Sequence, residues 1–265
     1  MVLMNKNEQV NFLIKELIKE KKELDSIKIP SSFDEKRKLF RALMNIRSPG
    51  TISKKFIEIQ NNFLSEEAKV KGIVELSAIA EYPNLKKISL WKGDITTLKV
   101  DGIVNAANSQ MLGCFIPNHS CIDNAIHSSA GIQLREECNN ITKKQGFLEP
   151  VGLAKITKSY NLPCKYVLHT VGPNITEYLT EKNCLELASS YKSCFNLATM
   201  KNLESLAFCC VSTGEYGFPK EIAAKIATST IIDLLKTPNS FKRIIFNVFT
   251  DEDYEIYSKI LSKYE

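Results

Sequence analysis

Apolar positions along the chain follow two different spacings, and the change between them falls near residue 88. Before it, apolar residues recur at i, i+3, i+4 and i+7, which places them on one face of a helix. The first such stripe consists of Val10, Leu13, Ile14, Leu17 and Ile18. Beyond residue 88, short apolar runs alternate with longer amphipathic stretches. We therefore divide the chain into an N-terminal helical extension, residues 1–85, and a second domain, residues 86–265.

Two more amphipathic helices are predicted in the extension, each after a serine. Ser32 begins a capping box, in which its side chain accepts from the N–H three residues on while Glu35 reaches back to the Ser32 N–H. The stripe that follows ends at Ser48-Pro49-Gly50, and the last stripe follows Ser53. Their members are Leu39, Phe40, Leu43 and Met44, then Phe56, Ile59, Phe63 and Leu64. No tether rich in Gly, Ser or Pro follows, so we expect these helices to pack against the second domain.

Strands and helices alternate in the second domain. Predicted strands are 88–91, 102–106, 154–159, 166–171, 205–211 and 243–249, and predicted helices are 122–138, 181–200, 220–235 and 251–263. Apolar runs separated by amphipathic helices indicate a sheet covered on both faces, an α/β/α sandwich. Ligands of such folds bind at the carboxyl ends of strands, where loops meet helix starts.

The composition is that of a globular protein, because 44% of the 265 residues are hydrophobic and 25% are charged. No apolar run approaches the roughly 20 residues that a membrane-spanning helix needs. The first twenty residues mix lysines and glutamates with apolar positions, unlike a secretory signal, so we expect a cytoplasmic protein. Its eight cysteines would then be reduced thiols, some of them metal ligands, with Cys209 and Cys210 inside a buried strand.

The positive net charge is confined to the first third of the chain. Residues 1–90 contain 17 Lys and Arg against 12 Asp and Glu, whereas residues 91–265 contain 18 of each. A nucleic-acid-binding protein would carry such a surplus within a recognisable motif, and none is present. The surplus indicates a solvated helical surface, and we expect a monomer with neither a nucleic-acid nor a membrane partner.

Two of the loops that follow strands carry polar residues suited to a nucleoside. In Gly93-Asp94-Ile95-Thr96 the acid can accept from the exocyclic amine of a purine, or can instead form an Asx turn with its own backbone. In Asn105-Ala106-Ala107-Asn108 two amides beside small side chains can bind ribose hydroxyls. Local amide–backbone bonds in an ordinary loop are the alternative for the second segment.

A glycine-containing loop, Ser212-Thr213-Gly214-Glu215-Tyr216-Gly217-Phe218-Pro219, lies between a predicted buried strand and a predicted helix. Its two glycines allow successive N–H groups to converge on a phosphate, and the helix start adds a dipole that favours an anion. Pro219 fits the first helical turn. A plain glycine turn is the alternative.

Two cysteines and a histidine occur within eight residues of the segment Gly113-Cys114-Phe115-Ile116-Pro117-Asn118-His119-Ser120-Cys121. Cys114, His119 and Cys121 offer two thiolates and an imidazole, a set suited to Zn²⁺. Three ligands leave a coordination position open, as catalytic zinc requires, and Asp123 would then orient or deprotonate water. The alternatives are a buried cysteine pair beside a loop histidine, and an Asp123 that only interacts with the helix dipole.

Together these segments resemble the macrodomain family from about Trp91 to the C-terminus. Residues 93–95 are similar to its adenine-contacting segment, 105–108 to its ribose segment and 212–218 to its diphosphate loop. Hydrolytic macrodomains ordinarily have a glycine-rich stretch before a helix that bears a catalytic Asp, whereas residues 113–121 here resemble the zinc-dependent subclass. That subclass also has an N-terminal helical extension, to which Leu43-Met44-Asn45-Ile46-Arg47 and Ile52-Ser53 are similar.

The resemblance implies a three-layer α/β/α macrodomain with a mixed central sheet, a Zn²⁺ cofactor, and hydrolysis of mono-ADP-ribose from modified protein side chains. It implies that Asp123 and Asn108 act in catalysis. The ADP-ribose site that it implies consists of Asp94, Ile95, Asn105, Asn108, Ser212, Thr213, Gly214, Glu215, Tyr216, Gly217, Phe218 and Asn247. It also implies a microbial system in which a sirtuin-like transferase modifies a lipoyl-carrier protein.

Three alternatives remain: a reader that binds ADP-ribose without cleaving it, a deacetylase of O-acetyl-ADP-ribose, and a structural metal. A reader needs neither a metal nor a nearby acid, so Asp123 beside three ligands favours catalysis. A structural zinc normally has four protein ligands, for which Cys138 and His127 are the candidates. Both lie beyond the first turn of a helix that starts near Ile122, so we favour the open site.

Overall fold

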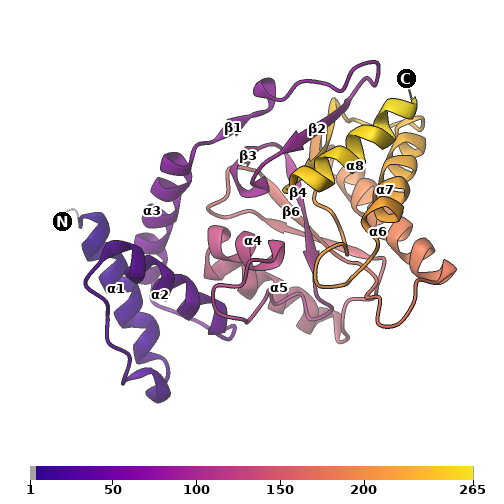
Figure 1. Ribbon diagram of the computed structural model, residues 1–265. Coiled ribbons are helices and arrows are strands. Elements are labelled where there is room, and N and C mark those ends of the chain that lie inside the picture. The colour runs from indigo at the N-terminus through magenta and orange to yellow at the C-terminus, as the bar shows by residue number, and fades with distance from the viewer. Residues whose placement is uncertain (1–3, 265) are drawn as a thin grey trace.

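The central feature of the protein, in a computed structural model that describes residues 4–264, is a six-stranded sheet in the order β2-β8-β7-β4-β6-β5 (Figure 1). Its strands are β2 (Ile88–Lys92), β4 (Gly102–Ala107), β5 (Ala154–Lys158), β6 (Tyr166–Val171), β7 (Ser205–Phe208) and β8 (Arg243–Val248). All neighbours pair in parallel except β5, which is antiparallel to β6. The predicted mixed sheet is confirmed.

Helices cover the sheet, which explains why its four inner strands, β4, β6, β7 and β8, are buried at nearly every position. The helices α6 (Glu181–Met200), α7 (Lys220–Leu235) and α8 (Asp251–Leu261) pack side by side, and α4 (Ile122–Ala130) and α5 (Ile132–Gln145) contact β4 and β5 (Figure 1). Val104, Leu168, Leu206 and Ile244, one from each of four adjacent strands, are fully buried. Each such side chain contributes about 1.5–3 kcal/mol to folding.

The predicted helix 122–138 is wrong in one respect, because the chain forms two helices there. The break is at Gly131, whose φ of 96° lies in the left-handed region. A Cβ at this position would lie 2.6 Å from Nε2 of Gln60, so the close approach also requires glycine. The predicted strand 205–211 also ends early, at Phe208, so Cys209 and Cys210 follow the strand. All eight cysteines are free thiols.

The extension contains the three predicted helices, α1 (Lys6–Lys19), α2 (Phe33–Ile46) and α3 (Lys54–Lys71). The predicted capping box is only half formed. Oγ of Ser32 accepts from the Glu35 N–H over 3.3 Å, but the Glu35 carboxylate accepts from the Ser32 hydroxyl, over 2.7 Å, and not from its N–H. A short connection then follows, in which β1 (Val74–Glu75) pairs in parallel with β3 (Leu98–Lys99).

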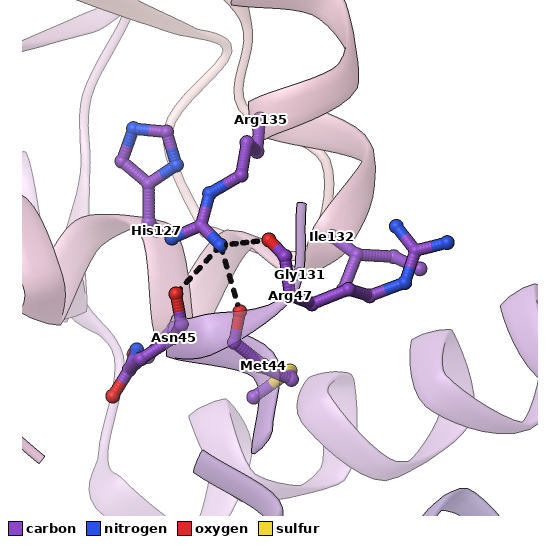
Figure 2. Close-up of a pocket in the computed structure, with 8 residues that line it drawn as sticks. Met44, Asn45, Arg47, His127, Gly131, Ile132 and Arg135 are labelled. Atoms are coloured by element: carbon purple, nitrogen blue, oxygen red, sulfur yellow. Dashed lines mark hydrogen bonds between the residues drawn. The ribbon is translucent and has the colours of Figure 1, made fainter. Parts of the chain in front are cut away.

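The extension packs against the second domain, as expected. Its apolar stripes form a core that also takes in Ile132 of α5, and α2 and α3 contact α4. Figure 2 shows the guanidinium of Arg135, in α5, reaching the end of α2, where Nη1 donates to the carbonyls of Met44, Asn45 and Arg47 over 2.9, 2.8 and 2.5 Å. The domain boundary at residue 85 stays a prediction.

Within residues 4–264 no helix is both long enough and apolar enough to cross a membrane.

Candidate active site

The predicted functional segments meet at one edge of the sheet. Residues 93–95 follow β2, 105–108 end β4, 212–218 follow β7, and Asn247 lies in β8. These strands are parallel, so their carboxyl ends share an edge. The segment 113–121, which we call the Cys–His loop, leads from that edge into α4.

The Cys–His loop brings its three candidate ligands together. Sγ of Cys114 lies 3.7 Å from Nδ1 of His119, and the donor atoms of Cys114, His119 and Cys121 are all within 4.8 Å of one another. Bond lengths to tetrahedral zinc place a sulfur and a nitrogen ligand about 3.6 Å apart. The residues present therefore fit a soft divalent cation with three protein ligands.

Local geometry explains how the loop folds back on itself. Gly113 has a φ of 78°, and a Cβ on it would lie 2.8 Å from the imidazole of His127. Asn118 adopts a left-handed φ of 55°, a conformation that Asn tolerates better than most residues. Cys121 is the N-cap of α4, and its sulfur accepts from the Asn124 N–H over 3.4 Å.

Burial and charge disfavour the ionised form of Cys121, one of the three candidate ligands. Burial raises the pKa of Cys121 to about 12. A hydrogen bond from the Asn124 N–H lowers this pKa, whereas the neighbouring Cys114 and Asp123 raise it. A divalent cation favours the thiolate form and so offsets this cost. A metal ion that binds the Cys121 sulfur would therefore have to displace its proton.

Asp123 is a buried carboxylate at the start of α4. Its Oδ1 accepts from Nδ2 of Asn105 over 2.8 Å and lies 3.5 Å from Nε2 of His127. Burial raises the pKa of Asp123 to about 6, although Asn105 and Arg135 favour the ionised form. The sequence predicted that Asp123 lies near the candidate metal ligands. In the structure Asp123 also contacts Asn105 of the predicted ribose segment.

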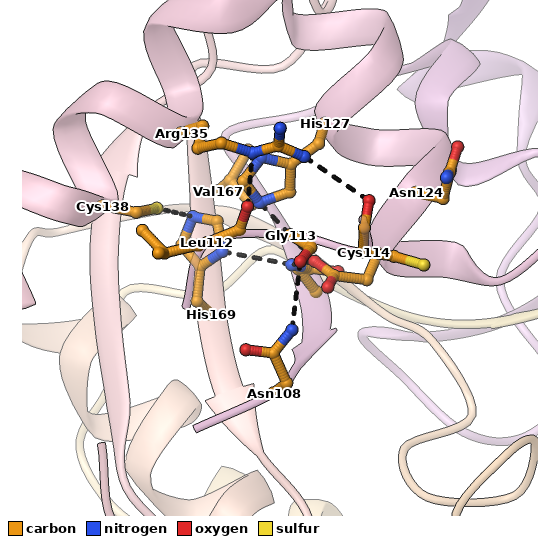
Figure 3. Close-up of polar contacts among 12 residues, drawn as sticks. Asn108, Leu112, Gly113, Cys114, Asn124, His127, Arg135, Cys138, Val167 and His169 are labelled. Carbon is orange, nitrogen blue, oxygen red and sulfur yellow. Dashed lines mark hydrogen bonds and ion pairs between the residues drawn. The ribbon is translucent and has the colours of Figure 1, made fainter. Parts of the chain in front are cut away.

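A buried polar network extends from this carboxylate through Asn105 to His169, which Figure 3 shows beside Cys138. Nδ2 of Asn105 donates to Nδ1 of His169 over 3.1 Å, so His169 carries its proton on Nε2 and donates to Oγ1 of Thr157 over 2.9 Å. Burial lowers the pKa of His169 to about 3 and keeps the ring neutral. His169 was not among the residues predicted from the sequence. The one feature that could have indicated it is that it is a lone histidine in the apolar strand Tyr166–Val171.

His127, Cys138 and His169 form a second group of donor atoms within 4.8 Å of one another. Both ring nitrogens of His169 already have hydrogen-bond partners, and Arg135 lies close enough to lower the pKa of His127 further, after burial and His169. His169 therefore belongs to a hydrogen-bonded network, whereas both ring nitrogens of His127 are buried without a hydrogen-bond partner among the described residues. The donor atoms of His127 and Cys138 are not grouped with those of the Cys–His loop, so neither residue is placed there as a fourth ligand.

Asp94 forms an Asx turn, which was the alternative to adenine binding for this residue. Its Oδ1 accepts from the N–H and the hydroxyl of Thr96 over 2.9 and 2.6 Å, and its Oδ2 pairs with Nζ of Lys71. Burial acts to raise the pKa of Asp94, but these partners outweigh it and the pKa lies below its usual range. Asp94 is one-third exposed and anionic, so a purine amine can reach it in competition with Lys71.

Three other predicted ligand residues have structural partners. Nδ2 of Asn108 donates to the Gly113 carbonyl over 3.1 Å, which ties the ribose segment to the Cys–His loop. Nδ2 of Asn247 donates to the Gly93 carbonyl over 2.9 Å and holds the loop that carries Asp94. The side chain of Ile95 is buried in the core, so only its backbone can face a ligand.

The loop from Ser212 to Phe218 is compact and closes on itself. The Phe218 N–H donates to the Ser212 carbonyl over 3.0 Å, and the Gly217 N–H to the Gly214 carbonyl over 2.9 Å. Among the described residues, the N–H groups of 213–216 have no backbone acceptor, which suits the predicted diphosphate contact.

The same loop lies against the rest of the site. Oε1 of Glu215 is 3.5 Å from Nε2 of His119. Burial raises the pKa of Tyr216, and the charge of Asp123 raises it further. The Tyr216 hydroxyl therefore lies within electrostatic reach of the Asp123 carboxylate. Before Glu215 and Tyr216 in the same loop, Thr213 is half-buried and Gly214 is exposed.

Two arginines that sequence analysis did not identify hold the Cys–His loop. Nη2 of Arg41, in α2, donates to the His119 carbonyl over 2.8 Å. Nε of Arg135 donates to the Leu112 carbonyl over 2.5 Å (Figure 3). Each is a charged residue on an amphipathic helix, so no local signal distinguishes it from a solvated one.

Comparison with known proteins adds independent evidence. Residues 104–227 match the model of the Macro domain family. A "Protein-ADP-ribose hydrolase" of Treponema medium is 48% identical over 98% of this chain and all of its own, and one of Staphylococcus aureus is 43% identical over 96% of each. The crystal structure of a Trypanosoma brucei macrodomain in complex with ADP-ribose is 30% identical, with a TM-score of 0.64 over 83% of this chain and 94% of that one.

Proposed function

Because the chain belongs to the Macro domain family and is similar over nearly its whole length to protein-ADP-ribose hydrolases, we propose that it hydrolyses mono-ADP-ribose from modified protein side chains with a zinc ion. One observation carries the proposal: the Asp123 carboxylate is held by Asn105 at the start of the helix that Cys121 caps. An acid, a ribose-binding amide and a soft-metal ligand set thus meet in one place.

The binding roles follow from the predicted segments. Asp94 accepts from the adenine amine, and the backbone of Ile95 lies beside it. Asn105 has a buried Oδ1 without a partner among the described residues, which would accept from a ribose hydroxyl once the segment moves to admit the ligand. The loop 212–218 supplies N–H groups to the diphosphate. This arrangement directs the distal ribose to the Cys–His loop.

Catalysis is assigned to Asp123, with Asn108 holding the ribose segment against the Cys–His loop. When bound to Cys114, His119 and Cys121, a zinc ion supplies a Lewis acid that polarises oxygen atoms of the distal ribose or the linkage. Asp123 accepts a proton from the attacking water through the carboxylate oxygen that Asn105 does not engage. The water oxygen bonds to the anomeric carbon of the distal ribose as the bond from that carbon to the protein side chain breaks, and the side chain leaves with the bonding electrons. The buried setting of Asp123 keeps bulk water from competing for that proton.

The identity of the modified protein is a further part of the proposal. The basic surplus of residues 1–90 favours an acidic partner. We propose that this partner is a lipoyl-carrier protein modified by a sirtuin-like transferase. The enzyme would act on it in the cytoplasm, as a monomer. Screening at cellular salt makes the electrostatic contribution a modest one.

A substrate panel tests this function. The enzyme is incubated with proteins singly modified on acidic, arginine or serine side chains, and with O-acetyl-ADP-ribose, while free ADP-ribose and acetate are followed. We expect ADP-ribose to be released from one class of protein, which names the linkage. Cleavage of the acetyl ester alone identifies a deacetylase instead, and tight binding without release identifies a reader.

A further inference from the structure

The N-terminal extension touches the Cys–His loop through two side chains of α2. The guanidinium of Arg41 donates from Nη2 to the His119 carbonyl over 2.8 Å and to Oδ1 of Asn124 over 2.7 Å. Asn124 in turn donates from Nδ2 to the Ile116 carbonyl over 3.0 Å. One arginine therefore fixes both ends of the turn that presents His119.

Asn45, one helical turn further along α2, holds the residue before His119. It is almost fully buried, and its Oδ1 accepts from the Asn118 N–H over 2.9 Å while its Nδ2 donates to Oγ of Ser128 over 3.0 Å. Asn118 is the left-handed residue of the loop, with a φ of 55°. Such a conformation persists where surrounding contacts stabilise it, and Asn45 provides one.

A buried cation sets the position of α2 relative to the loop. Arg135 donates to the carbonyls of Met44 and Asn45 at the end of α2, and also to those of Leu112 and Cys114 over 2.5 and 3.4 Å. The guanidinium thus bridges the extension and the start of the Cys–His loop. A shift of α2 would break bonds on both sides of Arg135.

We propose that the extension is part of the metal centre, in which Arg41 and Asn45 are positioning residues that hold the Cys–His loop in ligand geometry. The proposal rests on the proposed function only in naming zinc as the ion. Its physical basis is preorganisation: a loop without regular structure loses conformational entropy when it gathers three ligands, and contacts that order it beforehand remove that loss from binding. The extension thereby gains a role beyond packing.

Zinc affinity of the folded protein is the first test. Arg41→Ala should weaken zinc binding by about 10–100-fold, the range typical of residues that support metal ligands, measured by competition with a chromophoric chelator. Lys38→Ala is the matched control, because Lys38 lies on the same helix and is exposed. Its affinity should stay within about twofold of the wild type. An Arg41→Ala affinity equal to that of Lys38→Ala overturns the proposal.

The second test uses metal-free protein, so that it does not depend on zinc. Asn45→Ala should accelerate hydrogen exchange at the Asn118 amide, with circular dichroism showing that the fold is kept. Should Asn45→Ala fail to fold, Arg41→Ala is measured at the same amides, because Arg41 is only half-buried. Unchanged exchange overturns the positioning role. A wild-type protein that binds no zinc, or releases no ADP-ribose, overturns the proposed function. The comparison of hydrogen exchange between wild type and variant still decides whether Arg41 and Asn45 position the loop.

Discussion

The side-chain amide of Asn105 donates a hydrogen bond to Oδ1 of Asp123 over 2.8 Å, although the two residues are 18 positions apart. Asn105 lies at the end of β4 and Asp123 at the start of α4, so this bond joins the predicted ribose segment to the predicted catalytic acid. Both side chains are buried. The orientation of the carboxylate is therefore set by the sheet as well as by its own helix.

Replacement of Asp123 should separate turnover from binding. General-base assistance is worth about 10²–10⁴-fold, so Asp123→Ala should reduce turnover by about that factor while ADP-ribose still binds. Turnover is measured as ADP-ribose released from the modified protein, and binding by calorimetry. Asp233→Ala, which removes an exposed carboxylate of α7, is the control. Wild-type turnover in Asp123→Ala would exclude Asp123 from the mechanism.

Metal removal should abolish activity reversibly. Purified protein is expected to contain about one zinc per chain, because the Cys–His loop provides one set of three donors. Cys114→Ser and Cys121→Ser should each lower both zinc content and turnover. Cys184→Ser serves as the control, since Cys184 is a half-buried thiol of α6 outside the cluster. A protein that is metal-free as made, with turnover untouched by a chelator, contradicts the zinc assignment.

The sequence predicted the features that depend on residues close together along the chain, namely the secondary structure and the Cys–His loop. The spacing of apolar positions located the helices and strands, and the Cys114, His119 and Cys121 cluster followed from the loop sequence. The break at Gly131 was missed, because a single glycine within a helical pattern does not show that Gln60 packs against its Cα.

Contacts between distant segments were not predictable. Arg41 reaches the His119 carbonyl across 78 positions, and Asn105 reaches His169 across 64. Such pairings depend on how helices and strands pack, which apolar periodicity does not specify. The supporting residues of the site were therefore missed, and its ligand-facing residues stay predictions.

Adenine recognition by Asp94 should appear as a loss of affinity specific to the base. Asp94→Ala would leave the exocyclic amine unpaired, which costs about 1–3 kcal/mol in ADP-ribose binding by calorimetry. Affinity for ribose 5-phosphate, which lacks adenine, should not change. Because Lys71 occupies one carboxylate oxygen of Asp94, Lys71→Ala should leave ADP-ribose affinity equal or higher. Unchanged affinity in Asp94→Ala would show that Asp94 only forms its Asx turn.

The buried histidines should make the fold sensitive to mild acid. His169 has a folded pKa of about 3, against 6.5 for an unperturbed histidine, because burial disfavours its charged form. Burial also lowers the pKa of His127. Below pH 6.5 the unfolded chain therefore binds protons that the folded chain does not, and stability falls as the pH falls. Asp123 acts in the opposite sense below about pH 6, since its folded pKa is raised.

A comparison of variants isolates the contribution of His169. Between pH 7.5 and pH 5 one such histidine should cost about 2 kcal/mol of unfolding free energy, at about 1.4 kcal/mol per pH unit below 6.5. Urea unfolding of metal-free protein at both pH values measures it, since zinc release would otherwise add its own pH dependence. His169→Asn should lose about 2 kcal/mol less than the wild type over this interval, even if it is less stable at pH 7.5. Equal losses in wild type and His169→Asn would mean that His169 is protonated in the folded protein, contrary to its buried hydrogen bonds with Asn105 and Thr157.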